Sequence, residues 1–549
     1  MISAYTGTQI RAAEEPLLAA GMGAVLMQRA SQGLANAVIR ELQARGRKLY
    51  GASVAVLAGK GNNGGDGLFA AALLAARGVR TTAVLTGGAA HPEALAAFER
   101  AGGRVHILTD STLNRLTAEV ARADVVIDAV LGTGAKGGLR GTAAALAGRL
   151  LYSGLGGSLV VACDVPSGMD ADTGEVHAPV LSADLTVTFG AAKAGLLADP
   201  GADHAGRVHV VPIGIEENLP WPALRRFEAG DLFRLLPRPG RRSHKYSRGV
   251  LGVVAGSADY PGAAVLACRG ALAAGVGMVR YLGPPEAAQA VRQSCPEVVC
   301  SASSVADTHV QAWLVGSGMG PSDAEQLQRA RDAVESGLPV IADAGALPAL
   351  PAVLAPHVVL TPHAGELASL LERLRSIPDG SAADSRFTES PAAESPAFGQ
   401  GADRAAVEAH TLGAVRYAAG LTEATVLLKG ATTLVASPFQ DFYSQADGVP
   451  WLASAGSGDV LAGIIGALLA QLGSDVGRFR DAGIDPDERW AAIAALAASL
   501  HGLAGTTASA GGPLTAGRIA DVLPEVWGKV STLSIRLAQE RNSHPHPLR

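Results

Sequence analysis

Gly59-Lys60-Gly61-Asn62-Asn63-Gly64-Gly65-Asp66-Gly67 is the stretch that decides the fold of this chain. It follows an apolar run, residues 54–58, and it opens a helical pattern over residues 68–76. A glycine-rich turn between a strand and a helix leaves backbone N–H groups bare, and the helix dipole there favours an anion. The stretch therefore predicts a strand–loop–helix unit that holds a phosphate group.

This loop belongs to neither of the two common phosphate-binding classes. Gly59, Gly61 and Gly64 match the G-x-G-x-x-G spacing of dinucleotide folds. Such folds place an acidic residue at the end of the second strand, whereas the predicted second strand, 81–85, ends in Thr-Gly-Gly. A P-loop is excluded because no Lys-Ser or Lys-Thr pair follows the last glycine. A tight turn without a ligand stays as the alternative.

Length and composition bound the class of protein. The 549 residues are too many for one core and favour two large domains or three to four smaller ones. A net charge of −5 gives no pull toward nucleic acid or an anionic membrane. The longest apolar stretch, 460–470, is too short to span a bilayer. The first residues, 1–5, lack a basic region followed by an apolar one, so no signal peptide is expected. The four cysteines form no CxxC pair, so we expect free thiols and a cytoplasmic protein.

Two series of short β-rich runs alternate with helical patterns, which predicts two parallel α/β domains. The first series is 54–58, 81–85, 125–129, 159–163, 185–189 and 208–212. The second is 250–255, 279–282, 313–315, 340–343, 358–360, 426–428 and 433–435. A linker is expected at 216–226. We therefore predict domains over 1–218 and 228–530, a mobile insertion over 376–403 and a tail over 531–549.

Carboxylates end two strands of the first series. Asp128 and Asp164 each follow an apolar run, where a charged group is costly unless it is paired, hydrogen-bonded or bound to a cation. Ligands of open parallel sheets bind at the carboxyl ends of the strands, beside the loop at residues 59–67. These residues are candidate site groups, and the alternative is that each one caps neighbouring backbone N–H groups.

A second glycine-rich turn opens an apolar helix near the end of the chain. Gly456, Ser457 and Gly458 present successive N–H groups to a developing negative charge. Asp459 follows them, placed to accept a proton from a substrate hydroxyl. An N-cap aspartate after a flexible turn is the alternative.

The motifs of the first half resemble the NAD(P)H-hydrate epimerase family, which inverts the C6 carbinol of hydrated nicotinamide cofactors. They are Asn62-Asn63-Gly64-Gly65-Asp66, Asp128 followed by Gly132-Thr133-Gly134, and Asp164-Val165-Pro166-Ser167-Gly168, within residues 1–215. The resemblance implies a Rossmann-like three-layer domain. It implies that the substrate's phosphates and ribose are held by Asn62, Asn63, Gly64, Gly65, Asp66, Gly132, Thr133, Gly134, Ala135, Lys136, Gly137 and Gly138.

The same resemblance assigns chemical roles. Asn63, Asp128 and Ser167 are expected to bind a potassium ion (K+), because oxygen donors suit a hard cation. Asp164 is expected to face the nicotinamide ring as the acid/base, and Lys193 to assist it.

The second half resembles the nucleotide-dependent NAD(P)H-hydrate dehydratases, over about residues 228–525. The motifs are Ser243-His244-Lys245, the run 255–264, Gly316-Ser317-Gly318-Met319-Gly320, Thr361-Pro362-His363-Ala364-Gly365-Glu366 and the turn before Asp459. The resemblance implies a ribokinase-like α/β domain. It implies contacts with the hydrate from Ala264, Gly318, His363 and Asp459, and with the nucleotide from Lys429, Gly430, Ala431, Thr432, Thr433 and Gly458.

Together these resemblances imply a bifunctional enzyme that repairs hydrated NADH and NADPH (NADHX and NADPHX). The expected co-substrate is ADP or ATP, with Mg²⁺ bridging its phosphates. A homo-oligomer without nucleic-acid or membrane partners is expected. Two alternatives stay open: a ribokinase-type small-molecule kinase fused to a nucleotide-binding module, and a non-catalytic nucleotide sensor or scaffold.

Overall fold

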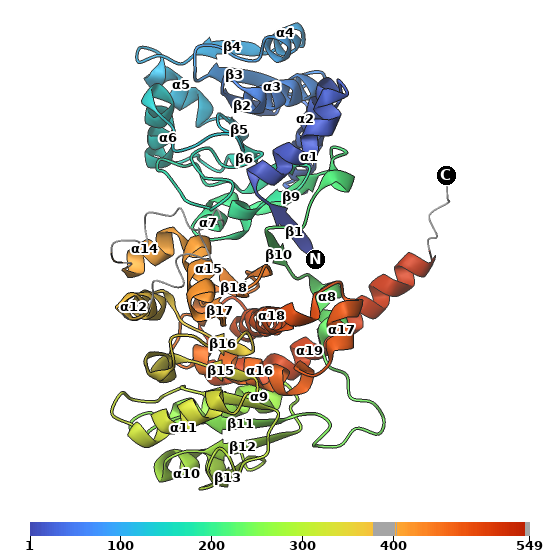
Figure 1. Cartoon of the computed structure of the whole chain (residues 1–549). Helices are drawn as coiled ribbons and strands as arrows, with labels where there is room; N and C mark the ends of the chain where they lie inside the picture. Colours follow the sequence, from blue (N-terminus) through green and yellow to red (C-terminus); the bar gives the residue numbers. More distant parts are fainter. Residues whose placement is uncertain (377–400, 402, 544–549) are drawn as a thin grey trace. The chain divides into compact units, whose positions relative to one another are not determined.

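The computed structural model describes residues 1–376, 401 and 403–543. Most of the insertion predicted over 376–403 lies outside the described residues. The chain divides into two compact units, one of Ser3–Leu224 and one of Met1–Ile2 with Arg225–Arg549 (Figure 1). Each unit is α/β, as the alternating pattern of the sequence predicts.

A parallel sheet forms the centre of the N-terminal unit. Its strand order is β4-β3-β2-β5-β6-β7-β9, and every neighbouring pair is parallel. The strands are β2 (Ser53–Ala58), β3 (Arg80–Leu85), β4 (Arg104–Ile107), β5 (Val125–Ala129), β6 (Leu159–Cys163), β7 (Leu185–Phe189) and β9 (Arg207–Val211). Six of these were expected from the sequence, and β4 was missed.

Helices cover both faces of this sheet, because alternate residues of each strand point to opposite sides. Val54 and Val56 of β2 belong to one buried cluster, and Ala55 and Leu57 belong to another. The first cluster includes residues of α2, α3 and α4, and the second includes residues of α5 and α6. The helices are α1 (Gly7–Ala19), α2 (Gly23–Ala44), α3 (Asn62–Ala75), α4 (Pro92–Arg100), α5 (Leu113–Val120), α6 (Gly141–Ser153) and α7 (Gly201–Ala205). The expected three-layer Rossmann-like arrangement is confirmed.

A short parallel pair lies beside the main sheet. β1 (Ile2–Tyr5) pairs with β8 (Ala192–Lys193), with Tyr5 opposite Lys193. This pairing fixes the backbone of Lys193 immediately after the end of β7.

The C-terminal unit contains a larger sheet, whose strands run in the order β13-β12-β11-β14-β15-β16-β17-β18-β19-β10. The pairs from β13 to β17 are parallel, and β18 is antiparallel to both of its neighbours. The strands are β10 (Leu224–Arg226), β11 (Val250–Val254), β12 (Met278–Leu282), β13 (Val299–Ser301), β14 (Ala312–Val315), β15 (Val340–Ala342), β16 (Val358–Leu360), β17 (Thr425–Leu428), β18 (Thr433–Ala436) and β19 (Phe442–Gln445).

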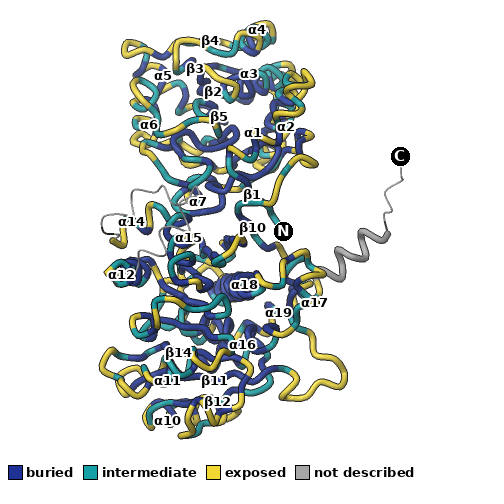
Figure 2. Tube along the Cα trace, in the orientation of Figure 1, coloured by how far each residue is buried: buried dark blue, intermediate teal, exposed yellow. Residues whose placement is uncertain are grey.

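Apolar helices build the core of this unit. α16 (Ser457–Leu472) packs on α9 (Pro261–Ala273) and on α18 (Arg489–Ser509). α18 is buried along most of its length, as its dark colour in Figure 2 shows. The other helices are α8 (Ala229–Leu235), α10 (Pro285–Ser294), α11 (Ala324–Glu335), α12 (Ala364–Arg375), α14 (Arg404–Ala409), α15 (Thr411–Thr422), α17 (Val476–Asp481) and α19 (Ala516–Ser543).

Two further features bear on the sequence predictions. The segment Pro486–Ser509 is long and apolar enough to cross a membrane, but 78% of its most apolar window is buried inside the protein, as in a core helix. The predicted tail is helical as far as Ser543, because α19 continues through it.

Candidate active sites

The loop after β2 packs tightly against the loop after β5. A Cβ atom on Gly59 would lie 2.1 Å from the carbonyl oxygen of Val130, and one on Gly64 would lie 2.0 Å from that of Gly59. Only glycine fits at either position. Gly61 caps α3, which begins at Asn62, so the N–H groups of the Asn-Asn-Gly-Gly-Asp motif form the first turn of a helix.

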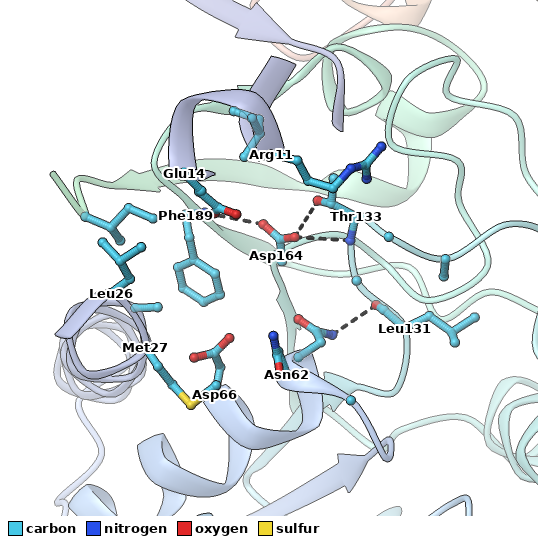
Figure 3. Close-up of a pocket in the computed structure, with 18 of the residues that line it drawn as sticks. Arg11, Glu14, Leu26, Met27, Asn62, Asp66, Leu131, Thr133, Asp164 and Phe189 are labelled. Carbon is cyan, nitrogen blue, oxygen red and sulfur yellow. Dashed lines mark hydrogen bonds between the residues drawn. The ribbon is translucent and has the colours of Figure 1, made fainter. Parts of the chain in front are cut away.

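A pocket of about 620 Å³ opens at this edge of the sheet (Figure 3). The predicted site residues that line it are Asn62, Asn63, Asp66, Gly132, Thr133, Gly134, Ala135, Asp164 and Lys193. Helices α1 and α2 close it with Arg11, Glu14, Leu26 and Met27, which the sequence analysis did not assign to the site. The structure thus brings residues that follow four strands, β2, β5, β6 and β7, together with two helices to one cavity.

Not every predicted residue lies on the pocket wall. Gly64 and Gly65 are buried in the first turn of α3. Lys136, Gly137 and Gly138 continue the loop after β5 but are not among the residues that line the pocket. The Lys136 ammonium instead lies 3.1 Å from Asp170 Oδ2.

Asp164 and Lys193 form a buried ion pair in the pocket. Lys193 Nζ donates to Asp164 Oδ1 at 2.5 Å, and only 1% of Lys193 is exposed. Asp164 Oδ2 accepts from the hydroxyl of Thr133 at 2.5 Å and from its N–H at 3.2 Å. Burial alone would raise the pKa of Asp164, but the Lys193 ammonium and these hydrogen bonds hold it below its usual value. Asp164 is therefore a charged carboxylate.

The backbone at Asp164 is strained. Its φ of +69° lies in the left-handed region, which is unfavourable for a residue with a side chain. Such strain persists where the surrounding structure holds it, commonly at functional sites. Here the strain places the carboxylate between Thr133 and Lys193.

Two other carboxyl groups line the same pocket in different surroundings. Burial raises the pKa of Asp66 well above its usual value, and the charge of Asp164 raises it further. Burial also raises the pKa of Glu14. The pocket thus combines one carboxyl group whose pKa is held below its usual value with two whose pKa is raised.

Asn63, Asp128 and Ser167 form hydrogen bonds around the start of the loop after β5, at Val130 and Leu131. Ser167 donates to both oxygens of Asp128, from its hydroxyl at 2.6 Å and its N–H at 2.8 Å. Asn63 Nδ2 donates to the Leu131 carbonyl at 3.0 Å. Burial raises the pKa of Asp128, so this carboxylate gains from a cation. A carboxylate, a hydroxyl and a carbonyl within one cluster fit a potassium ion.

A second polar cluster lies at the carboxyl ends of neighbouring strands in the C-terminal sheet. Asp343 follows β15 and accepts from Ser317 after β14 at 3.3 Å, from Thr361 after β16 at 2.9 Å and from Lys429 Nζ after β17 at 2.8 Å. Lys429 Nζ also lies 3.6 Å from Glu366 Oε2. The cluster is the counterpart, on another sheet, of the groups around Asp164.

Asp459 lies beside this cluster at the N-terminus of α16. Burial and the nearby charge of Asp343 raise its pKa to about 7, although Ser317 and Lys429 act against that shift. Gly456 adopts a φ of +88° and caps the helix, so the N–H groups of Gly456, Ser457 and Gly458 begin its first turn. A Cβ on Gly458 would lie 3.7 Å from Lys429 Nζ, which places the lysine near the predicted anion hole.

The other predicted residues of this half lie in different surroundings. His363 is exposed and caps α12, accepting from the N–H groups of Gly365 and Glu366. Gly318 has a φ of +67°, and Ala264 is fully buried on α9. Gly430, Ala431, Thr432 and Thr433 form the turn from β17 to β18, in which Gly430 and Ala431 are exposed.

Asp343, which accepts hydrogen bonds from three side chains of the second site, was not predicted from the sequence. The signal was available, because Asp343 ends an apolar strand in the same way as Asp128 and Asp164. No group of three or more His, Cys, Asp or Glu residues suited to a metal ion occurs within the described part of the chain.

Comparisons with known proteins agree with this division. The family model described as NAD(P)H-hydrate dehydratase matches residues 251–524, and that of the YjeF-related protein N-terminus matches residues 23–195. The bifunctional NAD(P)H-hydrate repair enzyme Nnr of Mycobacterium tuberculosis is 41% identical over 85% of this chain and 89% of its own length. That of Moorella thermoacetica is 32% identical over 91% and 92%.

A solved structure, the ADP/ATP-dependent NAD(P)H-hydrate dehydratase of Bacillus subtilis co-crystallised with ATP and Mg²⁺, is 24% identical. It covers 55% of this chain and 97% of its own, with a TM-score of 0.42, which is too low to carry an argument. The sequence relatives decide the matter: the chain belongs to the family of bifunctional NAD(P)H-hydrate repair enzymes.

Proposed function

We propose that this protein repairs hydrated NADH and NADPH in two steps. The N-terminal unit interconverts the R and S epimers at C6, and the C-terminal unit dehydrates the S epimer with consumption of ADP or ATP. One observation carries the proposal: each unit holds a desolvated carboxyl group, the buried Asp164 or the partly buried Asp459, among polar groups at the carboxyl ends of parallel strands. The family of the chain supplies the substrate class.

In the first step, Asp164 is the base. Lys193 and Thr133 hold it ionised and fix its orientation, so it accepts the proton of the C6 hydroxyl without first losing one. The first turn of α3 and the loop Gly132–Ala135 supply N–H groups for the phosphates and ribose. Asn63, Asp128 and Ser167 would hold potassium, whose positive charge would stabilise the loops that bind the substrate.

In the second step, Asp459 accepts the proton of the C6 hydroxyl while that oxygen attacks the terminal phosphoryl group of the nucleotide. The N–H groups at Gly456, Ser457 and Gly458 stabilise the transferring phosphoryl. Phosphate is a better leaving group than hydroxide, so the C6–O bond breaks and the leaving phosphate takes the proton from C5, while the electrons of the C5–H bond form the C5=C6 double bond. Lys429 and the turn to Thr433 would contact the nucleotide, and Mg²⁺ would supply positive charge to its phosphates.

Several further statements belong to this proposal. The functional domains are 1–218 and 228–530. The hydrate is contacted by His363, Gly318 and Ala264. The enzyme acts in the cytoplasm. A homo-oligomer stays a prediction. The kinase alternative is not favoured, because the two family models match the two halves of the chain and relatives that align over most of it are named bifunctional repair enzymes.

Separating the two activities tests the proposal. The substrate is an epimer mixture of NADH hydrate, followed by the return of reduced-nicotinamide absorbance and by chromatography of the epimers. Asp459→Ala should abolish dehydration and spare epimerisation, and Asp164→Ala should do the reverse. If both activities fall together in both variants, this division of labour is wrong, and release of a stable phosphorylated product favours the kinase.

A further inference from the structure

Asp66 is a pocket residue that the mechanism above does not use. It lies in the first turn of α3, only 9% of it is exposed, and it lines the same cavity as Asp164. In Figure 3 the two carboxyl groups come from different elements and point into the space beside the Phe189 ring. A substrate ring in that space would lie between them.

The hydrogen bonds around Asp66 offer little support to a negative charge. Among the described residues, Ser31 is its one side-chain partner, at 3.3 Å from Oδ1. The Ser31 hydroxyl has a single hydrogen, and the Met27 carbonyl accepts it at the shorter distance of 2.8 Å. A charged carboxylate here lacks a committed donor, and leaving a buried charge so poorly supported is costly.

The charges that face Asp66 point the same way. Burial has the largest effect in raising its pKa, and the charges of Asp164 and Glu14 raise it further, whereas the Ser31 hydrogen bond and the charge of Lys193 lower it. Lys193 is itself bound to Asp164. The pKa values of two carboxyl groups in one pocket are therefore shifted in opposite directions, which is the pattern of an acid and base pair.

We propose that Asp66 is the catalytic acid of the epimerisation, working opposite the base Asp164; this rests on the function proposed above. C6 of the hydrate bears both a hydroxyl and the ring nitrogen N1, so it can invert by ring opening. Asp164 takes the hydroxyl proton, the O–H electrons form a C=O bond, and the C6–N1 bond breaks. Asp66 gives its proton to N1, which receives that bond's electron pair.

Reversal of this step completes the inversion. After rotation about the C5–C6 bond, N1 attacks the other face of the aldehyde, Asp66 takes back the N1 proton, and Asp164 returns its proton to the oxygen. Both side chains end in their starting states, so no further reactant is needed. Phe189, which lines the same pocket, offers an apolar surface for the ring.

Glu14 is the rival for this role, and the structure ranks it second. It is only half-buried, and both Arg11 and Lys193 act to lower its pKa. Glu14 therefore serves as the matched comparison in the test.

The test measures epimerisation alone, in the absence of nucleotide, so that dehydration cannot run. S-enriched NADH hydrate is mixed with wild type, Asp66→Asn, Asp66→Glu or Glu14→Gln. The rate at which the R epimer forms is measured by chromatography over a range of pH, and the uncatalysed rate is subtracted. For wild type we expect kcat to decline on the alkaline side of the profile, as pH rises through the raised pKa of Asp66. In Asp66→Asn, kcat should fall about 100-fold or more and this alkaline decline should vanish, while Asp66→Glu and Glu14→Gln keep it.

The outcomes separate two kinds of failure. A wild type that does not epimerise at all refutes the proposed function. A wild type that epimerises, together with an Asp66→Asn variant whose KM rises while kcat and the alkaline decline are unchanged, shows that Asp66 only binds substrate and overturns this inference. Loss of the alkaline decline in Glu14→Gln instead would assign the acid to Glu14. If Asp66→Asn fails to fold, the decline in Asp66→Glu decides, because its midpoint must move with the changed carboxyl.

Discussion

The charge on Asp459 depends on two neighbours of opposite sign, and this dependence can be tested by removing each one. Burial has the largest effect on the pKa of Asp459, Asp343 raises this pKa further and Lys429 lowers it. The combined effect is a pKa of about 7. A base must be ionised to act, so dehydration should fall as pH drops below about 7. Asp343→Asn should move this decline to lower pH, and Lys429→Met should move it to higher pH.

The expected size follows from the charge removed. A neighbouring unit charge shifts a carboxyl pKa by about one unit, equivalent to ~1.4 kcal/mol. With a pKa of about 7, roughly a tenth of wild-type Asp459 is ionised at pH 6. Asp343→Asn should raise that share to about a half, which is roughly a fivefold gain relative to its own plateau. Lys429→Met should cause a loss of similar size at pH 7.

The assay is the pH dependence of kcat/KM for the S epimer, followed by reduced-nicotinamide absorbance at fixed nucleotide. Titration of the nucleotide itself is common to all proteins, so only the displacement between curves is informative. Asp521→Asn is the matched control, because it removes an equal charge from an exposed ion pair with Arg269 on the same unit. Displacement of both variant curves in the same direction, or none beyond that of the control, would refute the electrostatic account.

Three further predictions concern the two sites. Lys193→Met leaves Asp164 as a buried charge without its cation, so the unfolding free energy should fall by about 3–5 kcal/mol and epimerisation by about 100-fold, with dehydration retained. Ser167→Ala removes the donor to Asp128 and should raise the potassium concentration needed for half-maximal epimerisation roughly tenfold, as measured by titration against tetramethylammonium. Folding raises the pKa of Asp459, so the folded state favours the protonated form of this carboxyl group. The resulting contribution to stability is complete below pH 3.8 and is lost as pH rises through about 7. Asp459→Asn should therefore raise the unfolding temperature at pH 8 but not at pH 4, with a gain of about 4 kcal/mol at most.

The buried parts of the fold were predictable from the sequence. β5, β6, β7 and β16 begin and end where the apolar runs do, because strands covered on both faces read as continuous apolar stretches. β4 (Arg104–Ile107) was missed because it is an edge strand with partly exposed, mixed residues. The N-terminal loops were recognisable by their glycines, which the close backbone contacts of Gly59 and Gly64 require.

The partners of the site residues were less predictable. Thr133 was expected to hold phosphate or ribose, yet its hydroxyl donates to Asp164. Nothing in the local sequence indicates that α1 places Glu14 over the same cavity, because that depends on how the helix packs. Which carboxyl groups are charged follows from three-dimensional neighbours alone.

The contrast between Asp164 and Asp459 shows how one fold principle gives two kinds of base. Both carboxyl groups are desolvated, which by itself raises the pKa of each. Lys193 bonds directly to Asp164, whereas Lys429 bonds to Asp343 and acts on Asp459 only from a distance. The position of one lysine relative to the strand ends therefore decides whether the carboxylate stays charged well below neutral pH. In mildly acidic solution the epimers should still interconvert while dehydration slows, so dehydration should limit the overall rate of repair.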